Sequence, residues 1–467
     1  MTKLLRKVFS SAVLLAGIYA SSADAAQLLT PAQMHRDLTY LRTKILSQDS
    51  NPWLYTKQSD FERLYATTYG DVDKPMDRVA FYRHAARLAA SLRDGHTLVD
   101  PLIDDFQAYA KTGGVLPVEV SFIDGRLYVA SNASGNENLK PGAEITAING
   151  RSVAAIVTDY RGLINDVHPI YDVYARLFRE LYWLSYGGPA TFDIAWNDGK
   201  SKGVVKVASH VYPEDAFHSY LPGGQRYSFQ MKTGEIGILT INSFTPSDGF
   251  SSFLDESFTT LATTHAKALI IDVRKNGGGS GRLAEETVSY LTDKPYKQIG
   301  AFYVKVTDDL KDLYARGDTH TDADTKRLVM ENPSGSLVDG LKGNEPLMAT
   351  PAHRDHVFHG PVYLLTANNT FSAAAMFTAY VKCNGLGQVV GEAPGQATNF
   401  VADAVPFTMP ASGLTFDVSF SEIHMPCEQS YTAGIAPDYP VKPSPEGLKT
   451  GQDEVLDYAV QLATRRQ

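Results

Sequence analysis

The stretch PVYLLTANNTFSAAAMFTAY, residues 361–380, predicts the fold and raises the question of function. Its first six residues are mostly apolar, which is typical of a strand in a parallel sheet that is covered on both faces. From Ala373 onward, the alanine-rich sequence predicts a helix. Ser372 lies between the two elements. It is therefore either a nucleophile or an ordinary residue at a helix start, where serine is favoured.

Three further apolar runs predict strands of the same kind: IGILTI (236–241), KALIIDV (267–273) and GQVVGE (387–392). A helix is expected near residues 283–291, between the second of these runs and the strand at 361–366. Strands that alternate with helices in this way indicate βαβ units and a parallel sheet. The chain from about residue 234 therefore predicts an α/β domain, and a final helix is expected at 453–462.

The sequence before residue 234 has a different texture. Residues 27–92 carry apolar side chains at helical spacing, which predicts helices that stop at Asp94-Gly95. From about residue 116, short alternating runs and the turn at Asn149-Gly150 predict strands. A helix is expected around Asp172–Trp183, and a hairpin is expected between residues 191 and 208.

Composition limits the function classes. The 467 residues are too many for one core and predict two to four domains. The polar segment 308–359 has weak periodicity and is expected to be a surface insertion. The net charge of −9 disfavours a sequence-independent surface for nucleic acid or anionic membranes. Nothing in the sequence implies a cofactor.

The N-terminus has the pattern of a signal peptide. A basic start is followed by an apolar stretch, Val8–Ala20, and by the small-x-small sequence Ala23-Asp24-Ala25. We expect cleavage after Ala25, because the apolar stretch is short for a retained membrane anchor. No later segment is long and apolar enough to span a membrane. The mature protein is therefore expected to be periplasmic or secreted.

The two cysteines, Cys383 and Cys427, are an even number in a chain that is expected to be exported. This context favours a disulfide between them, and the alternative is two free buried thiols.

Two loops carry the residues that could do chemistry. VRKNGGGSG (273–281) and ANNTFS (367–372) each follow the carboxyl end of a predicted strand, where ligands bind in open α/β sheets. The backbone amides of Gly278 and Ala373 could stabilise an oxyanion beside Ser372. Each part alone has an ordinary explanation, since serine caps helices and glycine runs mark turns.

A serine nucleophile needs a base. Lys382 lies far down the same helix, and Lys275 is expected to be solvated. Of the twelve histidines, His96 stands out because DGHT (94–97) places it on a turn directly after a helix. His353, His356 and His359 suggest a metal site, but their spacing fits no standard zinc pattern, and no metal is expected.

At this point the chain resembles a known family, the tail-specific or C-terminal-processing serine peptidases, whose relatives include the tricorn protease core. The matching pieces are, in order, IGILTINSF, ALIIDVRKNGGG, VYLLTANNTFSAAAMF, VVGE and GIAPDYPV, between residues 236 and 441. LPVEV, LYVAS and LKPGAEITAINGRSV resemble a PDZ-like module. The resemblance implies an α/β fold with a ClpP/crotonase-like core, an N-terminal helical domain and a PDZ-like β-rich module.

The resemblance also implies site residues. Ser372 matches the nucleophile, and Gly278 and Ala373 match the oxyanion-hole amides, although Gly277 and Gly279 are close alternatives. The column of the catalytic lysine holds Ala397. The chain is therefore similar to the tricorn-like subfamily with a histidine base, which His96 fits.

The match to that subfamily has two departures. Gly95 stands where tricorn has a participating serine, and Tyr431 stands in the column of its glutamate. The nearest acid to Tyr431 is Glu428, directly after Cys427. It is either a third catalytic residue, brought close by a Cys383–Cys427 disulfide, or a plain surface acid.

The resemblance completes the predicted organisation of the chain. The expected parts are residues 1–25 as signal peptide, 26–112 as N-terminal helical domain, 113–160 as PDZ-like module, 161–233 as connecting helix and hairpin, 234–446 as α/β peptidase core and 447–467 as C-terminal helix. The predicted function is an exported serine endopeptidase that cleaves peptides or protein C-terminal tails. The alternatives are a non-catalytic binding protein on the same fold and a PDZ-type adaptor.

Overall fold

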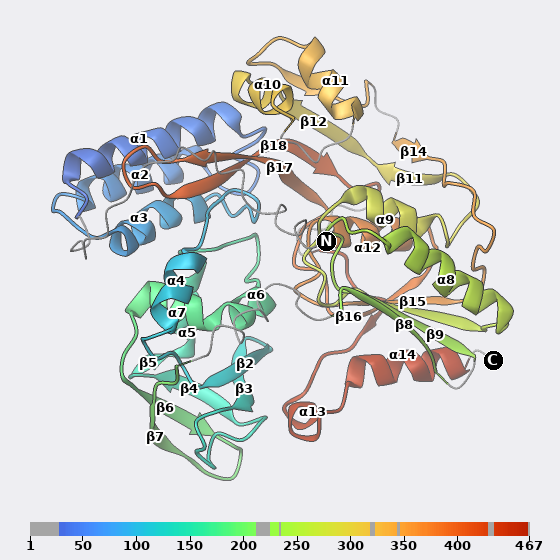
Figure 1. The fold of residues 1–467 in the computed structure, drawn as a ribbon, viewed down its shortest axis with the longest axis horizontal. Coiled ribbons are helices and arrows are strands. Elements are labelled where there is room, and N and C mark those ends of the chain that lie inside the picture. Colours follow the sequence, from blue (N-terminus) through green and yellow to red (C-terminus); the bar gives the residue numbers. More distant parts are fainter. Residues whose placement is uncertain are drawn as a thin grey trace, which may run out of the picture.

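The structure is a computed structural model that describes residues 28–211, 225–232, 235–317, 323–342, 346–427 and 434–465. The expected signal peptide, Glu428 and Tyr431 lie outside these ranges. Figure 1 shows the α/β core on one side, the N-terminal helices and a second β-rich region on the other, and a long hairpin that connects them.

The core sheet has six strands in the order β19 (Tyr439–Pro440), β16 (Gln388–Gly391), β15 (Val362–Thr366), β10 (Ala268–Asp272), β9 (Ile236–Ile241) and β8 (Tyr227–Lys232). The first five strands are parallel, and β8 pairs antiparallel with β9. The four apolar runs of the sequence all lie in this sheet. The predicted α/β class is confirmed.

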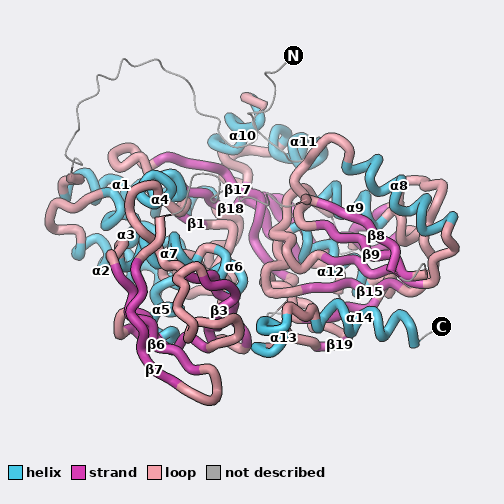
Figure 2. Tube along the Cα trace, turned by 60° about the horizontal axis from the view of Figure 1, so that its bottom comes forward, coloured by secondary structure: helices cyan, strands magenta, loops and turns pink. Residues whose placement is uncertain are grey.

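Helices cover both faces of the core sheet. On one face, α8 (Phe250–Thr263), α9 (Gly281–Val288) and α12 (Ala373–Cys383) pack on a cluster that includes Leu269 and Ile271. On the other, α14 (Glu454–Arg465) packs on the alternate side chains, including Ile270. Figure 2 shows α8 and α14 on opposite sides of the strands. Two-sided burial explains why these strands are almost wholly apolar.

Three helices form the N-terminal region: α1 (Pro31–Gln48), α2 (Gln58–Asp71) and α3 (Arg78–Ala90). Thr30 and Gln33 form a capping box at the start of α1, with Pro31 in the first turn. Both features satisfy the helix start that the sequence predicts. The apolar stripe of α1, which includes Leu38 and Leu41, is fully buried.

The long hairpin consists of β17 (Asn399–Thr408) and β18 (Thr415–His424). On its other side, β18 pairs antiparallel with β1 (Leu98–Val99) and with β12 (Ala301–Lys305), which pairs with β13 (Leu337–Asp339). The hairpin leaves the α/β core and reaches the N-terminal helices (Figure 1), where its apolar side chains join the same buried cluster as α1 and α3.

A second sheet has the order β2 (Val118–Ile123), β3 (Arg126–Asn132), β4 (Glu144–Ile148), β6 (Thr191–Asn197) and β7 (Lys202–Ala208), with β5 (Arg151–Ser152) beside β4. Four helices accompany it: α4 (Ile103–Ala110), α5 (Val153–Arg161), α6 (Tyr171–Arg176) and α7 (Phe178–Tyr186). The expected hairpin at 191–208 is present. It extends this sheet through β4–β6 pairing, which the assignment to a connecting segment had missed.

The segment 308–359 is more structured than the sequence suggests. It contains α10 (Asp308–Ala315), α11 (Ala323–Glu331), β13, and β14 (Leu347–Ala349), which pairs with β11 (Tyr296–Ile299). Leu310 and Tyr314 of α10 are fully buried in the cluster of the N-terminal helices. Short elements with few apolar positions explain the weak periodicity.

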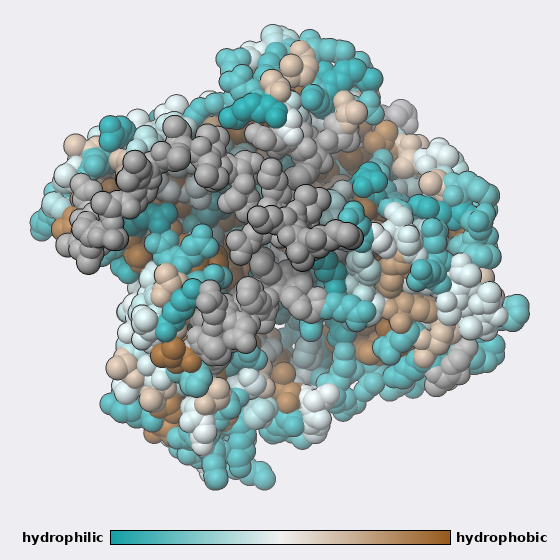
Figure 3. Space-filling model, in the orientation of Figure 1, coloured by the Kyte–Doolittle hydropathy of each residue, from teal (hydrophilic) through white to brown (hydrophobic). Residues whose placement is uncertain are grey.

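Hydrophilic residues dominate the described surface on the face shown in Figure 3, and hydrophobic residues there form small scattered groups. None of the helices within the described residues has the length and apolar character that crossing a membrane requires.

Cys383 and Cys427 face each other with their Cα atoms 5.2 Å apart and are bonded in the structure. This spacing suits a disulfide. Cys383 is the last residue of α12, and Cys427 follows the end of β18. The bond therefore ties the helix that begins after Ser372 to the long hairpin.

We predict that the double variant Cys383→Ser/Cys427→Ser loses up to about 4 kcal/mol of unfolding free energy, because the bond closes a long loop in the unfolded chain. Chemical denaturation of the unreduced protein, with reduced wild type as the matched control, measures this loss. Two titratable thiols in the unreduced, denatured wild type would contradict the disulfide itself.

Candidate active site

Ser372 does not cap its helix in the ordinary way. It occupies the position before α12 with φ 52° and ψ −126°, and its side chain makes no capping hydrogen bond. A positive φ is unfavourable for a residue with a Cβ, and such strain concentrates at functional sites. The hydroxyl is left free to meet a partner from another part of the chain.

Neighbouring loops hold this backbone conformation. The Ser372 amide donates to Gln396 Oε1 at 2.6 Å, and the Phe371 amide donates to the carbonyl of Asn276 at 3.1 Å. The Thr370 hydroxyl donates to the carbonyl of Val273 at 3.0 Å. The Asn369 amide donates to Asp172 of α6 at 3.0 Å. The serine loop is thus fixed to the glycine loop and to the second β-rich region.

The glycine loop lies against the start of α12. A Cβ on Gly278 would lie 2.6 Å from the Cβ of Ser372, so only glycine fits there. The predicted oxyanion role requires a free amide on Gly278, but this amide already has an acceptor. It donates to Asn276 Oδ1 at 2.9 Å. Asn276 is fully buried and also donates to the carbonyl of Ile241, which anchors the loop to β9.

The backbone amides of Gly279 and Ala373 are better candidates for the oxyanion hole. The Gly278 carbonyl accepts a hydrogen bond from Phe244, and in a trans peptide the next N–H points the opposite way. The Gly279 amide is therefore directed away from Phe244. Within the described part of the chain, neither Gly279 nor Ala373 has an acceptor for its amide. Ala373 also lies at the positive end of the α12 dipole.

His96 meets Ser372. Its Nε2 lies 3.2 Å from Ser372 Oγ, although the residues are 276 positions apart in sequence. The pairing of β1 with β18 brings His96 here. Next to it, the buried Thr97 hydroxyl accepts from the Ser419 amide at 3.0 Å and donates to the Ser419 hydroxyl at 3.2 Å.

Aromatic rings enclose the imidazole. The His96 ring stacks on Phe371 at 5.0 Å and on Phe400 of β17 at 6.2 Å between centroids. Its side chain is 17% exposed. Gly95 makes room for Phe371, because a Cβ on Gly95 would lie 2.6 Å from the Phe371 ring. Phe371 thus fills the space that the absence of a side chain on Gly95 leaves open.

Carboxyl groups set the charge of His96. Burial by itself lowers the pKa of His96, but Asp94, Asp166 and Asp403 outweigh it and raise this pKa above its ordinary value of 6.5. Burial also raises the pKa of Asp166 to about 7.

The other predicted candidates lie apart from this pair or outside the description. Lys382 bonds Asp438 at 2.7 Å and the carbonyl of Ala436 at 3.0 Å. Ala397 is buried. Glu428 lies outside the described residues. His353 is almost fully exposed, and no group of three or more metal-ligand side chains gathers among the described residues.

Sequence reasoning missed three residues that contact the pair or fix the loops beside it. Asp94 was assigned only to a helix stop, yet it accepts from the His96 amide at 2.9 Å. Gln396 and Asn276 hold the backbones of the two loops. Asn276 stands directly before the glycines, which is a usable signal. Nothing in the sequence around Gln396 indicates its contact with Ser372.

A family model matches the part of the chain that holds the core sheet. Residues 235–441 match the model of peptidase family S41. This region, which contains Ser372 and the glycine loop, is a serine-type peptidase domain. No curated protein matches the chain.

Mature CPAF, a solved structure, shares the fold. The chain is similar to mature CPAF complexed with lactacystin, with a TM-score of 0.64 and 15% identity over 93% of this chain and 98% of that chain. It has a TM-score of 0.45 and 14% identity with the photosystem II D1 C-terminal processing protease, over 91% and 97% of the two chains. The tricorn protease gives a TM-score of 0.42 and 15% identity, over 93% and 37%.

We predict that Gly95→Ala lowers the unfolding free energy by about 1–3 kcal/mol, the usual cost of overpacking. The added methyl would lie 2.6 Å from the Phe371 ring and 2.7 Å from Asp166 Oδ2. Urea unfolding measures the change. Gly70→Ala in α2 is the matched control, since nothing lies within 4 Å of its added methyl. Equal stability of the Gly95→Ala variant and wild type would contradict the contact.

Proposed function

We propose that this chain, whose residues 235–441 match the model of peptidase family S41, is an exported serine endopeptidase. In this proposal Ser372 is the nucleophile and His96 is the general base. Its substrates are peptides or protein C-terminal tails. The observation that carries the proposal is the 3.2 Å contact between His96 Nε2 and Ser372 Oγ, together with the strained backbone of Ser372.

The residues perform acyl transfer as follows. His96 Nε2 takes the Ser372 proton while Oγ attacks the peptide carbonyl, and the same proton then goes to the leaving amine as the C–N bond breaks. Water attacks the acyl-enzyme, again with His96 as base, and releases Ser372. The amides of Ala373 and Gly279 stabilise the oxyanion, and the positive end of α12 adds to this effect.

The second β-rich region is the proposed site for the rest of the substrate. Its strand β2 is an edge strand in the order of that sheet, which supports binding of an extended peptide by strand pairing. Asp172 of α6 bonds the loop before Ser372, so this region is physically joined to the nucleophile. Export is supported by the signal pattern of residues 1–25 and by the cysteine pair.

We predict that a fluorophosphonate probe labels Ser372 in the mature protein and that labelling is absent in Ser372→Ala. His96→Ala should slow labelling by about 10²- to 10⁴-fold, the usual contribution of a general base. His84→Ala on α3 and Lys382→Ala are the controls and should label at the wild-type rate. Mass spectrometry of the adduct gives the site and the rate.

Unchanged labelling in His96→Ala would mean that another group is the base. Absence of labelling in a folded protein would favour the second candidate function, a non-catalytic binding protein on the same fold.

The pH dependence follows from the charge of His96. Only neutral imidazole accepts the serine proton, and the carboxyl groups raise the pKa of His96 above 6.5. The labelling rate should therefore rise with pH through a midpoint above 6.5 and be lost below it. A pH series of labelling rates measures the midpoint. A midpoint below 6.5 would contradict the proposed charge environment.

A further inference from the structure

His96 has one nitrogen without a partner. Its Nδ1 is buried and makes no hydrogen bond in the described part of the chain. Leaving a buried N–H unpaired costs free energy, and a histidine base works only when the proton on its far nitrogen is fixed. If Nδ1 carries no proton, Nε2 carries it and cannot accept from Ser372. The group that holds the Nδ1 proton therefore decides whether the base functions.

The carboxylate of Asp94 is directed at this nitrogen. Asp94 Oδ1 lies 3.7 Å from His96 Nδ1 and accepts the His96 backbone amide at 2.9 Å. Its other oxygen, Oδ2, accepts the Ser419 hydroxyl at 2.8 Å. Ser419 is itself fixed by Thr97 on the β1–β18 pairing. The position of Asp94 is thus tied to the same element that places His96.

Other acidic groups face His96 from separate elements. The hydrogen bonds of Asp166 and Asp403 go to other residues. Asp166, from the loop after α5, accepts the amides of Gly95 and Val167. Asp403 of β17 accepts the Ser421 hydroxyl at 2.7 Å. Burial raises the pKa of Asp417 on β18 to about 7. Asp94 forms an ion-pair contact with the imidazole, with 3.7 Å between Oδ1 and Nδ1.

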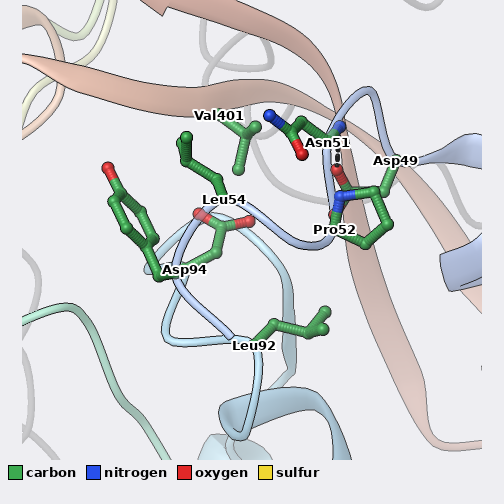
Figure 4. Close-up of a pocket in the computed structure, with 8 residues that line it drawn as sticks. Asp49, Asn51, Pro52, Leu54, Leu92, Asp94 and Val401 are labelled. Atoms are coloured by element: carbon green, nitrogen blue, oxygen red, sulfur yellow. Dashed lines mark hydrogen bonds between the residues drawn. The ribbon is translucent and has the colours of Figure 1, made fainter. Parts of the chain in front are cut away.

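The surroundings of Asp94 strengthen its effect. It is 5% exposed and lines a small pocket with the apolar residues Leu54, Leu92, Pro52 and Val401 and with the polar residues Asp49, Asn51 and Tyr55. Figure 4 shows Asp94 among the residues that line this pocket. Because Asp94 is buried away from bulk water, the interaction between its carboxylate and a nearby imidazolium is stronger than in water.

We propose that Asp94 is the positioning residue of the base. It holds the Nδ1 proton of His96 and stabilises the imidazolium that forms when Ser372 gives up its proton. A shift of about 1 Å closes the 3.7 Å separation to a hydrogen bond. The inference rests on the proposed function, and it assigns to Asp94 the role for which the sequence suggested Glu428.

The test compares Asp94→Asn, Ser419→Ala, Glu428→Gln and the control Glu422→Gln. Asparagine retains an oxygen for the His96 amide but removes the charge. Glu422 is a buried carboxylate on β18 that bonds Asn51 and His424, away from Nδ1. Fluorophosphonate labelling of Ser372 is followed from low to high pH. The pKa of His96 is followed by NMR in a Ser372→Ala background.

Asp94→Asn should lower the high-pH labelling rate by about 10²- to 10⁴-fold and move the midpoint to lower pH. Ser419→Ala should lower the labelling rate and the midpoint in the same direction, by smaller amounts. Glu422→Gln should change neither the rate nor the midpoint. The NMR titration applies even when Asp94→Asn is inactive. If Asp94→Asn does not fold, Ser419→Ala decides.

Three outcomes separate the two hypotheses. Wild-type labelling in His96→Ala overturns the proposed role of His96 as the base, and with it the role of Asp94. If His96→Ala loses labelling but Asp94→Asn keeps the wild-type rate and midpoint, only the role of Asp94 is overturned. If Asp94→Asn does not fold, a folded Ser419→Ala with the wild-type rate and midpoint gives the same conclusion. Loss in Glu428→Gln with no effect of Asp94→Asn assigns the position to Glu428.

Discussion

The pairing of β1 with β18 is the contact on which the site depends. Leu98 pairs with Asp417 and Val99 pairs with Phe416. This pairing places His96, two residues before Leu98, against Ser372. The strand β18 belongs to a hairpin that grows out of the α/β core and buries its apolar side chains among the N-terminal helices. One hairpin therefore carries both the packing of the N-terminal region and the alignment of the proposed base.

The disulfide between Cys383 and Cys427 links α12 covalently to the chain that follows β18. One cysteine ends the helix that starts after Ser372, and the other follows the strand that aligns His96. Ser372 directly precedes the helix on one side of the disulfide, and His96 is placed by the strand that leads to its other side. A cross-link at this place limits how far α12 can move from the hairpin, and Ser372 and His96 must stay within hydrogen-bond reach for proton transfer.

The sequence predicts the core well and the site in part. Buried parallel strands such as 267–273 are nearly continuous apolar runs, so periodicity and length suffice to find them. The sequence analysis predicts no strands for the hairpin at 399–424, although Phe416, Val418 and Phe420 alternate with polar residues as in a strand. Pro406, in the other half of the hairpin, is a residue that disfavours strands. The structure allows that proline on β17, an edge strand. The occupied amide of Gly278 depends on the rotamer of Asn276, which sequence cannot give.

The order of the elements along the chain has a consequence for biosynthesis. His96 is translated early, Ser372 much later, and the strand that aligns them ends at His424, close to the C-terminus. A nascent chain on the ribosome can hold both side chains and still lack the strand that joins them. The proposed dyad therefore forms only after β18 has emerged, and a chain truncated before this strand would keep Ser372 and His96 without their alignment.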